Sequence, residues 1–338
     1  MTIRAAVIGA GAWGTALAHL LAAKDEEVAI WAYEPEVAAQ IGEHHENRTY
    51  LPGIALPAGL RASTSLADVL GGRELVLCVA PSHVLRAVMT EAAPFLPVGA
   101  TVVSATKGIE NETLMTMSEV LEDVLPLSCH ARLAFLSGPS FAREVAQMQP
   151  TAVTVASRFE RVAEQVQRSL ATPYLRVYTS TDVAGVELGG ALKNVVAIGA
   201  GAASGLGLGT NARAALITRG LAEMTRLAVK RGANPLTLAG LSGIGDLVLT
   251  CTGELSRNRA VGEKLGQGMK LADIVREMHQ VAEGVKTARS AYHLARREEV
   301  DMPIAEMVYR MLYEDLPVAE AVVGLMGRKL GKETHYAL

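Results

Sequence analysis

A glycine-rich turn near the amino terminus limits most strongly what this chain can fold into. Residues 9–14 read GAGAWG and follow a short apolar run at residues 5–8. Behind the turn, apolar residues recur at positions 13, 16, 17, 20 and 21, which is the spacing of one helix face. A GxGxxG motif between a strand and a helix is typical of dinucleotide-binding domains. Gly9 would permit the tight turn, Gly11 would let a pyrophosphate approach the backbone, and Gly14 would let the helix pack close to the strand.

The composition fits a folded globular protein and excludes several classes of function. Half of the 338 residues are hydrophobic and a fifth are charged, which suffices for two domains with their own cores. The net charge of −3 gives no electrostatic footprint for nucleic acid or for an anionic membrane. Because the chain starts directly in a predicted strand, we expect no signal peptide.

Cysteine and histidine usage favours a reducing compartment and no metal. Cys78, Cys129 and Cys251 are odd in number and widely spaced, which does not fit a disulfide framework or a zinc site. His44 and His45 have no cysteine or carboxylate at metal-ligand spacing. We therefore expect a cytoplasmic protein without a metal site.

Two different periodicities divide the chain. In the first half, short runs rich in Val, Ile, Leu and Ala alternate with helical patterns, as expected for parallel strands buried on both faces. The predicted strands cover residues 5–8, 28–31, 75–80, 101–105, 133–136, 151–156 and 174–179. Helical patterns then dominate, over residues 186–203, 211–231, 235–241, 257–265, 271–279, 284–297, 303–313 and 317–324. We predict a Rossmann-type doubly wound α/β domain over residues 1–182, followed by an all-α domain over residues 183–338.

The most apolar stretch, residues 188–203, is predicted to be a buried helix, since it falls short of the roughly 20 apolar residues that a membrane span needs. It carries Lys193, the one charged residue between Glu187 and Arg213. Burial would disfavour the ammonium form of Lys193 and move its pKa toward neutrality, which suits a general base for an alcohol. The alternative is a lysine that extends its ammonium group into water.

Polar residues follow three of the predicted strands, at the sheet edge where open α/β domains bind ligands. They are residues 81–83 (PSH), 106–108 (TKG) and 137–140 (SGPS). Lys107 comes directly after a buried strand, where its ammonium group could neutralise a phosphate or hold a carbonyl oxygen. The alternative is a solvated surface lysine. His83 could act as an acid–base group, although a structural or solvated histidine is the commoner case.

A third polar cluster lies in the second half. Two glycines before Asp246 predict a tight turn that presents a carboxylate. Ser256 is a predicted helix N-cap, with Arg257 and Asn258 in the first turn. A cation at a helix N-terminus opposes the macrodipole, so Arg257 makes sense there if an anion binds. An arginine fork beside an amide suits a phosphate.

The order and spacing of these motifs closely resemble those of the bacterial NAD(P)-dependent glycerol-3-phosphate dehydrogenases, over nearly the full length. The resemblance rests on residues 9–14, 81–84 (PSHV), 105–108 (ATKG), 137–139, 192–195 (LKNV), 211–213 (NAR), 245–247 (GDL), 256–258 (SRN) and 283–284 (EG). It implies reversible hydride transfer between sn-glycerol 3-phosphate and dihydroxyacetone phosphate, with NAD or NADP as cofactor. It also implies a homodimer that supplies glycerol 3-phosphate for phospholipid synthesis.

The resemblance further implies roles for particular residues. Lys193 would accept the proton in the oxidation direction and donate it in reduction, and Lys107 would contact both substrate and cofactor. The implied substrate site consists of Lys107, Gly138, Ser140, Lys193, Asp246, Ser256, Arg257 and Asn258, with Arg257 and Asn258 near the phosphate. The implied cofactor site consists of Gly9, Gly11, Ala12, Trp13, Gly14, Tyr33, Lys107, Ala142, Arg257, Val281 and Glu283.

One departure from the family pattern bears on the choice of cofactor. Many members carry a basic residue at position 33, which suits the 2′-phosphate of NADP, whereas this chain has Tyr33 followed by Glu34. Glu34 stands about where the ribose-binding carboxylate of an NAD fingerprint falls. The sequence therefore favours NAD, unless Arg4, Lys24 or Arg48 supplies a cation. Alternatively, Glu34 simply begins the next helix ahead of Pro35.

Two other functions remain open at this point. One is a related two-domain dehydrogenase that acts on a small hydroxy acid, against which the predicted phosphate site at Arg257 and Asn258 argues. The other is a non-catalytic dinucleotide-binding sensor, which would need the glycine turn but would have no use for Lys107 and Lys193 together.

Overall fold

The computed structural model describes residues 2–278 and 282–333. The chain divides into two compact units, Met1–Lys107 with Met115–Glu187, and Gly108–Leu114 with Leu188–Leu338. The domain boundary after residue 182 stays a prediction.

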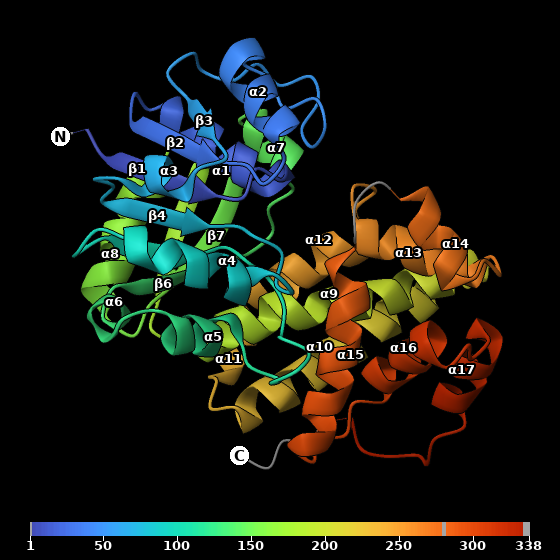
Figure 1. The fold of residues 1–338 in the computed structure, drawn as a ribbon. Coiled ribbons are helices and arrows are strands. Elements are labelled where there is room, and N and C mark those ends of the chain that lie inside the picture. Colours follow the sequence, from blue (N-terminus) through green and yellow to red (C-terminus); the bar gives the residue numbers. More distant parts are fainter. Residues whose placement is uncertain (1, 279–281, 334–338) are drawn as a thin grey trace. The chain divides into compact units, whose positions relative to one another are not determined.

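The first unit is built on an eight-stranded sheet of order β3-β2-β1-β4-β5-β6-β7-β8 (Figure 1). Neighbouring strands run parallel except for β6 and β7, which are antiparallel. The strands are β1 (Arg4–Ile8), β2 (Glu27–Trp31), β3 (Arg61–Ser63), β4 (Leu75–Cys78), β5 (Thr101–Ser104), β6 (Leu133–Ser137), β7 (Thr151–Ala156) and β8 (Leu175–Ser180). The first six follow the Rossmann strand order, which confirms the predicted fold class. All seven predicted strands are present, and the short polar edge strand β3 was not predicted.

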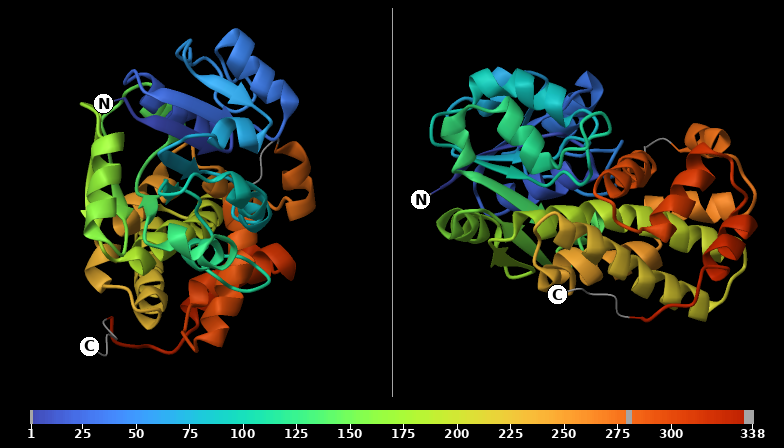
Figure 2. Two further views of the ribbon diagram at one scale, coloured as in Figure 1. Left: turned by 60° about the vertical axis from the view of Figure 1, so that its left-hand side comes forward. Right: turned by 90° about the horizontal axis from the view of Figure 1, so that it is seen from below.

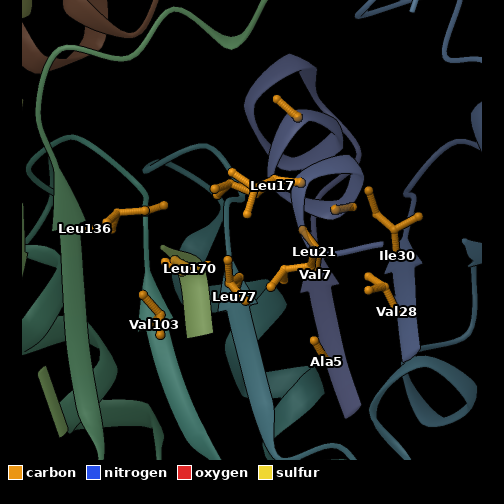
Figure 3. Close-up of a cluster of buried hydrophobic side chains, with 14 of the residues drawn as sticks. Ala5, Val7, Leu17, Leu21, Val28, Ile30, Leu77, Val103, Leu136 and Leu170 are labelled. Atoms are coloured by element: carbon orange, nitrogen blue, oxygen red, sulfur yellow. The ribbon is translucent and has the colours of Figure 1, made fainter. Parts of the chain in front are cut away.

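Helices cover both faces of this sheet. They are α1 (Ala12–Ala22), α2 (Pro35–His44), α3 (Leu66–Leu70), α4 (Leu85–Ala92), η1 (Ala93–Phe95), α5 (Met117–Val124), α6 (Leu127–His130), α7 (Ala142–Ala146) and α8 (Glu160–Leu170). Leu17 and Leu21 point from α1 toward the sheet, where Val7 lies on β1, and all three are fully buried (Figure 3). Each fully buried leucine contributes about 1.5–3 kcal/mol relative to an exposed one. This packing fixes α1, and with it the glycine turn, on the sheet.

The second unit is built of helices, as predicted. They are α9 (Val183–Gly205, whose first turns belong to the first unit), α10 (Thr210–Lys230), α11 (Pro235–Leu238), η2 (Leu241–Gly245), α12 (Asp246–Thr252), α13 (Arg257–Gly266), α14 (Leu271–Glu277), α15 (Glu283–Arg297), α16 (Pro303–Tyr313) and α17 (Val318–Met326). Figure 2 shows α9 and α10 running alongside the orange and red helices of this unit.

Two segments are long and apolar enough to span a membrane by length and composition alone, α9 and residues 235–252. The most apolar window of α9 is 94% buried inside the protein, as predicted for a core helix. Residues 235–252 are three short elements rather than one regular helix, and 39% of their window is buried.

Glycines bring α9 and α13 into backbone contact. A Cβ on Gly201 would lie 2.0 Å from the carbonyl oxygen of Arg259, and one on Gly205 would lie 2.0 Å from that of Glu263. The contact is reciprocal, because a Cβ on Gly262 would lie 1.9 Å from the carbonyl oxygen of Ile198. Any larger residue at these positions would push the two helices apart.

The buried Glu223 of α10 caps helix α16. Its carboxylate accepts hydrogen bonds from the backbone N–H groups of Ile304 (2.8 Å) and Ala305 (3.2 Å). Burial raises the pKa of Glu223 to about 7, although the two N–H groups act in the opposite direction. In the unfolded chain the carboxyl titrates near 4.5, so its stabilising contribution is complete below that pH and is lost as the pH rises through about 7.

We expect Glu223→Ala to lower the free energy of unfolding by about 2 kcal/mol at pH 5, since two buried N–H groups lose their acceptor. The loss should be smaller at pH 8, where the wild-type protein must bury a charge. Urea unfolding at both pH values measures the difference, with the exposed Glu320→Ala as a control that should change little. A loss that grows with pH would contradict this account.

Candidate functional site

The glycine turn has the geometry that the motif predicts. Gly9 adopts a φ of +112°, and a Cβ there would lie 3.1 Å from the backbone of Val79 and Ala80. A Cβ on Gly14 would lie 1.9 Å from the carbonyl oxygen of Gly9, so α1 starts in direct contact with the turn. A Cβ on Gly11, by contrast, would meet no atom within 4 Å. The backbone around Gly11 and the first N–H groups of α1, at Ala12 and Trp13, are thus open to an anion.

A buried side chain holds this turn in place. The amide of Asn47, which is fully buried, donates hydrogen bonds to the carbonyl oxygen of Ala10 and to Thr15 Oγ1, each at 2.8 Å. Its own oxygen accepts a hydrogen bond from the backbone N–H of Tyr50 at 3.0 Å. The sequence interpretation missed Asn47, because a polar loop residue 37 positions from the turn gives no signal of this contact.

Tyr33 and Glu34 follow the end of β2. This is the position at which Rossmann domains commonly carry the carboxylate that binds the ribose. Tyr33 is 78% exposed and makes an edge-on contact with Trp31. Glu34 precedes Pro35 as the N-cap residue of α2, but its side chain does not cap the helix. Its carboxylate instead accepts a hydrogen bond from the Tyr50 hydroxyl at 2.9 Å. The backbone of Glu34 therefore stands at the start of α2, as the alternative interpretation predicted. Its carboxylate stays near the end of β2, hydrogen-bonded to Tyr50.

The three basic residues considered as alternatives for a 2′-phosphate differ in position. Arg4 begins β1, at the opposite end of that strand from the glycine turn, and pairs with Glu74. Lys24 precedes β2 and donates a hydrogen bond to the carbonyl oxygen of Ser169. Only Arg48, next to Asn47, lies near the turn, and it pairs with Glu46 at 3.0 Å.

The polar strand ends meet at one edge of the sheet, because β4, β5 and β6 are adjacent and parallel. Lys107 Nζ donates a hydrogen bond to the carbonyl oxygen of Gly138 at 3.2 Å, and Ser140 Oγ donates to the same oxygen at 3.1 Å. Thr106 Oγ1 donates to the carbonyl oxygen of Ala80 at 2.7 Å. Ala142 begins α7, which packs against α1. The structure thus gathers the predicted residues of the first unit at the carboxyl ends of the strands.

In the second unit, Lys193 of α9 forms a buried ion pair. Its Nζ lies 2.5 Å from Asp246 Oδ1 and 2.8 Å from Thr250 Oγ1. The side chain of Lys193 is 9% exposed and that of Asp246 is fully buried. The alternative of a lysine with its ammonium group in water is therefore wrong. Thr250 was not predicted, although its i+4 spacing from Asp246 would have indicated it once a helix was assigned there.

The charge of Lys193 depends on more than burial. Apolar surroundings disfavour its ammonium form, whereas the carboxylate of Asp246 favours it. The prediction from burial alone is therefore incomplete, because the ion-pair partner is 53 residues away in the sequence. Cys251, adjacent to Thr250 and also buried, has its pKa raised to about 12 by desolvation, so it does not supply a thiolate to this cluster.

The tight turn predicted before Asp246 is absent from the described structure. Residues Leu241–Gly245 form a π-helical turn, with the N–H of Gly245 bonded to the carbonyl oxygen of Gly240, and Asp246 is the first residue of α12. A Cβ on Gly243 would lie 1.9 Å from the carbonyl oxygen of Leu238. Close packing, rather than a turn, explains this glycine.

Ser256 is the N-cap of α13, as predicted, and its Oγ accepts a hydrogen bond from the N–H of Arg259 at 3.2 Å. Arg257 is exposed in the first turn. Asn258 is buried, donates to Asn194 Oδ1 and accepts from the N–H of Gly284, both at 2.9 Å. Its amide therefore ties α13 to α9 and to the start of α15.

Two further predicted cofactor-site residues are Val281 and Glu283. Glu283 is the first residue of α15, whereas Val281 lies outside the described residues. Within residues 2–278 and 282–333, no group of three or more His, Cys, Asp or Glu side chains could hold a metal ion.

Two family models, the curated relatives and a solved structure identify the family of this chain. The N-terminal model of NAD-dependent glycerol-3-phosphate dehydrogenase matches residues 4–163, and the C-terminal model matches residues 182–323. The chain is 58% identical over 333 residues to glycerol-3-phosphate dehydrogenase [NAD(P)+] of Geobacter sp. strain M21, covering 98% of this chain and 99% of the relative. It is 56% identical to the enzyme of the same name from Myxococcus xanthus, with 97% and 98% covered. The crystal structure of glycerol-3-phosphate dehydrogenase from Coxiella burnetii superposes with a TM-score of 0.92 at 39% identity, covering 97% and 99%.

Proposed function

Because the chain belongs to the family of NAD-dependent glycerol-3-phosphate dehydrogenases, we propose that it interconverts sn-glycerol 3-phosphate and dihydroxyacetone phosphate, with NAD(H) or NADP(H) as cofactor. The observation that carries this proposal is the buried Lys193, held by Asp246 and Thr250. The relatives at 56–58% identity share the name of this activity, which favours it over a hydroxy-acid dehydrogenase or a dinucleotide sensor.

The first unit fits a dinucleotide. The open backbone at Gly11 and the N-terminus of α1 suit a pyrophosphate, with Ala12, Trp13 and Gly14 around it. Tyr33, Lys107 and Ala142 complete the proposed cofactor site in this unit, and Arg257, Val281 and Glu283 are its proposed contributors from the second. When bound, the nicotinamide supplies or accepts the hydride.

Lys193 is the proposed acid–base group. In the reducing direction a hydride adds to the carbonyl carbon of dihydroxyacetone phosphate while the Lys193 ammonium gives its proton to the carbonyl oxygen, which forms the hydroxyl. The Asp246 carboxylate favours the protonated lysine that this direction needs. In the oxidising direction the neutral amine takes the hydroxyl proton as the hydride leaves the same carbon.

The proposed substrate contacts fall into two groups. Lys107, Gly138 and Ser140 come from the strand ends of the first unit. In the second unit, Asp246 orients Lys193, and Arg257 reads the phosphate at the N-terminus of α13. Ser256 and Asn258 already serve the fold through the N-cap and the bridge to Asn194. We therefore propose that Ser256 and Asn258 mainly position Arg257. Their lone pairs and N–H groups that are not used in these bonds could also bind the substrate.

One assay tests the activity. Oxidation of NADH and of NADPH is followed with dihydroxyacetone phosphate and, in parallel, with unphosphorylated dihydroxyacetone. We expect turnover of the phosphorylated substrate and a much weaker reaction without the phosphate. Equal rates with both substrates would contradict a phosphate-reading site.

We expect the protein to use NADH at least as well as NADPH. A 2′-phosphate near Glu34 would meet a like charge, and Tyr33 offers no cation. Values of kcat/KM for both cofactors at low salt measure this preference. Tyr33→Arg should shift it toward NADPH. Arg48→Ala is a matched test of Arg48, which follows the turn-binding Asn47 in the sequence. A tenfold preference of the wild-type protein for NADPH would refute this account.

The cellular setting is also a proposal. We propose a cytoplasmic homodimer that supplies glycerol 3-phosphate for phospholipid synthesis. The cysteines support a reducing compartment, since Cys78, Cys129 and Cys251 are all free thiols and burial raises the pKa of Cys78 to about 12. Light scattering on the purified protein measures the oligomeric state.

A further inference from the structure

A small cavity lies in the first unit at the carboxyl ends of β5 and β6. It offers about 10 Å³ of space for the centre of a water molecule, which is close to what one molecule needs. Its lining is mixed, with the polar residues Ser104, Thr106, Lys107, Ser137 and Glu187 beside the apolar residues Phe135, Leu136 and Val186. The cavity is thus at the lower size limit for a single water, and its polar side chains could hold one there.

Two of the lining hydroxyl groups are buried without a partner. Ser104 is 2% exposed and Ser137 is 4% exposed, and neither Oγ has a hydrogen-bond partner within the described part of the chain. A buried hydroxyl that makes no hydrogen bond is unfavourable, and native proteins commonly satisfy such groups with an ordered water. Ser104 and Ser137 stand on the neighbouring strands β5 and β6, two register positions apart, so they lie on the same face of the sheet.

The third polar group comes from the start of α9. One carboxylate oxygen of Glu187 accepts a hydrogen bond from the backbone N–H of Ser118 at 2.8 Å, and the other accepts from Ser118 Oγ at 2.5 Å. The Thr116 side chain also hydrogen-bonds to this carboxylate. Since a carboxylate has about four lone-pair sites, it can accept one further hydrogen bond. Desolvation raises the pKa of Glu187 to about 7, so near neutral pH the group can also donate.

We propose that this cavity binds one water molecule, held by the hydroxyl groups of Ser104 and Ser137 and the carboxyl group of Glu187. The water joins the two strand ends that the hydrogen bond from Lys107 to the carbonyl oxygen of Gly138 also joins. It therefore fixes the segment that carries Lys107, and its hydrogen-bonding groups act as positioning residues. The bound water stands on the geometry alone, whereas its effect on catalysis rests on the proposed role of Lys107.

Thermal unfolding tests for the water independently of activity. If the water is bound, Ser104→Ala and Ser137→Ala each remove one of its hydrogen bonds, and the melting temperature should fall by about 2–4 °C. If the hydroxyls have no partner at all, removing them leaves the melting temperature unchanged or raises it, which overturns the proposal.

Thr101 supplies a matched control on the same strand. Its hydroxyl is also buried and also lacks a partner among the residues that the structure describes, but it does not line the cavity. Thr101→Val should therefore leave the melting temperature unchanged or raise it. A fall equal to that of the two serine variants would overturn the assignment of the water to this cavity.

A double-mutant cycle tests the positioning role. Ser137→Ala should lower kcat/KM by roughly 2–10-fold, the factor that corresponds to one hydrogen bond. In a Lys107→Met background it should lower kcat/KM no further, because the effect passes through Lys107. Equal losses in both backgrounds overturn the positioning role. If the three variants show the expected melting temperatures but the wild-type protein has no activity on dihydroxyacetone phosphate, the bound water stands and the proposed function is contradicted.

Discussion

We expect Lys193→Met to lower kcat by about 10²–10⁴-fold, the usual contribution of a general acid–base group. Binding of NADH without substrate should stay nearly intact, since Lys193 belongs to the second unit and the glycine turn to the first. Steady-state kinetics and fluorescence titration with NADH measure the two quantities. A variant that retains a third of the wild-type turnover at saturating substrate would exclude Lys193 as the proton donor.

Two companion variants separate chemistry from folding. Lys193→Met leaves the buried carboxylate of Asp246 without its cation, and breaking a buried ion pair typically costs about 3–5 kcal/mol of stability. Lys193→Arg keeps the positive charge but cannot release its proton at neutral pH, so it should be folded and inactive. Lys230→Met, at the exposed end of α10, should leave both activity and stability unchanged.

The second large effect is expected at Arg257. Arg257→Ala should raise the KM for dihydroxyacetone phosphate by roughly 10–150-fold, which corresponds to about 1.5–3 kcal/mol for a hydrogen bond to a charged group. NADH binding in the absence of substrate should change far less. The control substrate is unphosphorylated dihydroxyacetone, whose reaction the substitution should leave almost unchanged.

An equal rise in KM for both substrates would mean that Arg257 does not bind the phosphate. Arg276→Ala is a matched control in the same unit, because Arg276 is 78% exposed and pairs only with neighbouring residues of α14 among its described contacts. It should leave both KM values unchanged.

The strand pattern could be predicted because buried parallel strands carry continuous apolar runs, as β4 does with Leu-Val-Leu-Cys. The same rule fails for β3, whose three residues Arg61–Ser63 form a polar edge strand held only by β2. A different rule, that closely spaced glycines indicate a tight turn, fails near Asp246, where Gly243 lies in the π-helical turn η2 and packs closely on α11. Local sequence cannot distinguish these two uses of glycine.

Individual site residues could be predicted better than their pairings. The isolation of Lys193 in an apolar run signals burial, but its contacts with Asp246 and Thr250 depend on how α12 packs on α9. In the same way, Asn258 is recognisable as part of a motif, whereas its bridge between Asn194 and Gly284 is a tertiary contact. The sequence does not identify Glu187 as a candidate site residue, because the residues around it lie on β5, β6 and α5, far from it in the chain.

The glycine contact between α9 and α13 fixes the spacing between two residues that are proposed to bind the substrate. Lys193 is on α9 and Arg257 begins α13, and the two helices are locked backbone to backbone at Gly201 and Gly205 and joined by the amides of Asn194 and Asn258. On the proposed roles, the spacing between the reduced carbon and the phosphate is therefore built into one rigid pair of helices. On these proposed roles we expect longer phosphorylated homologues to be poor substrates, because their carbonyl carbon and their phosphate could not both reach Lys193 and Arg257.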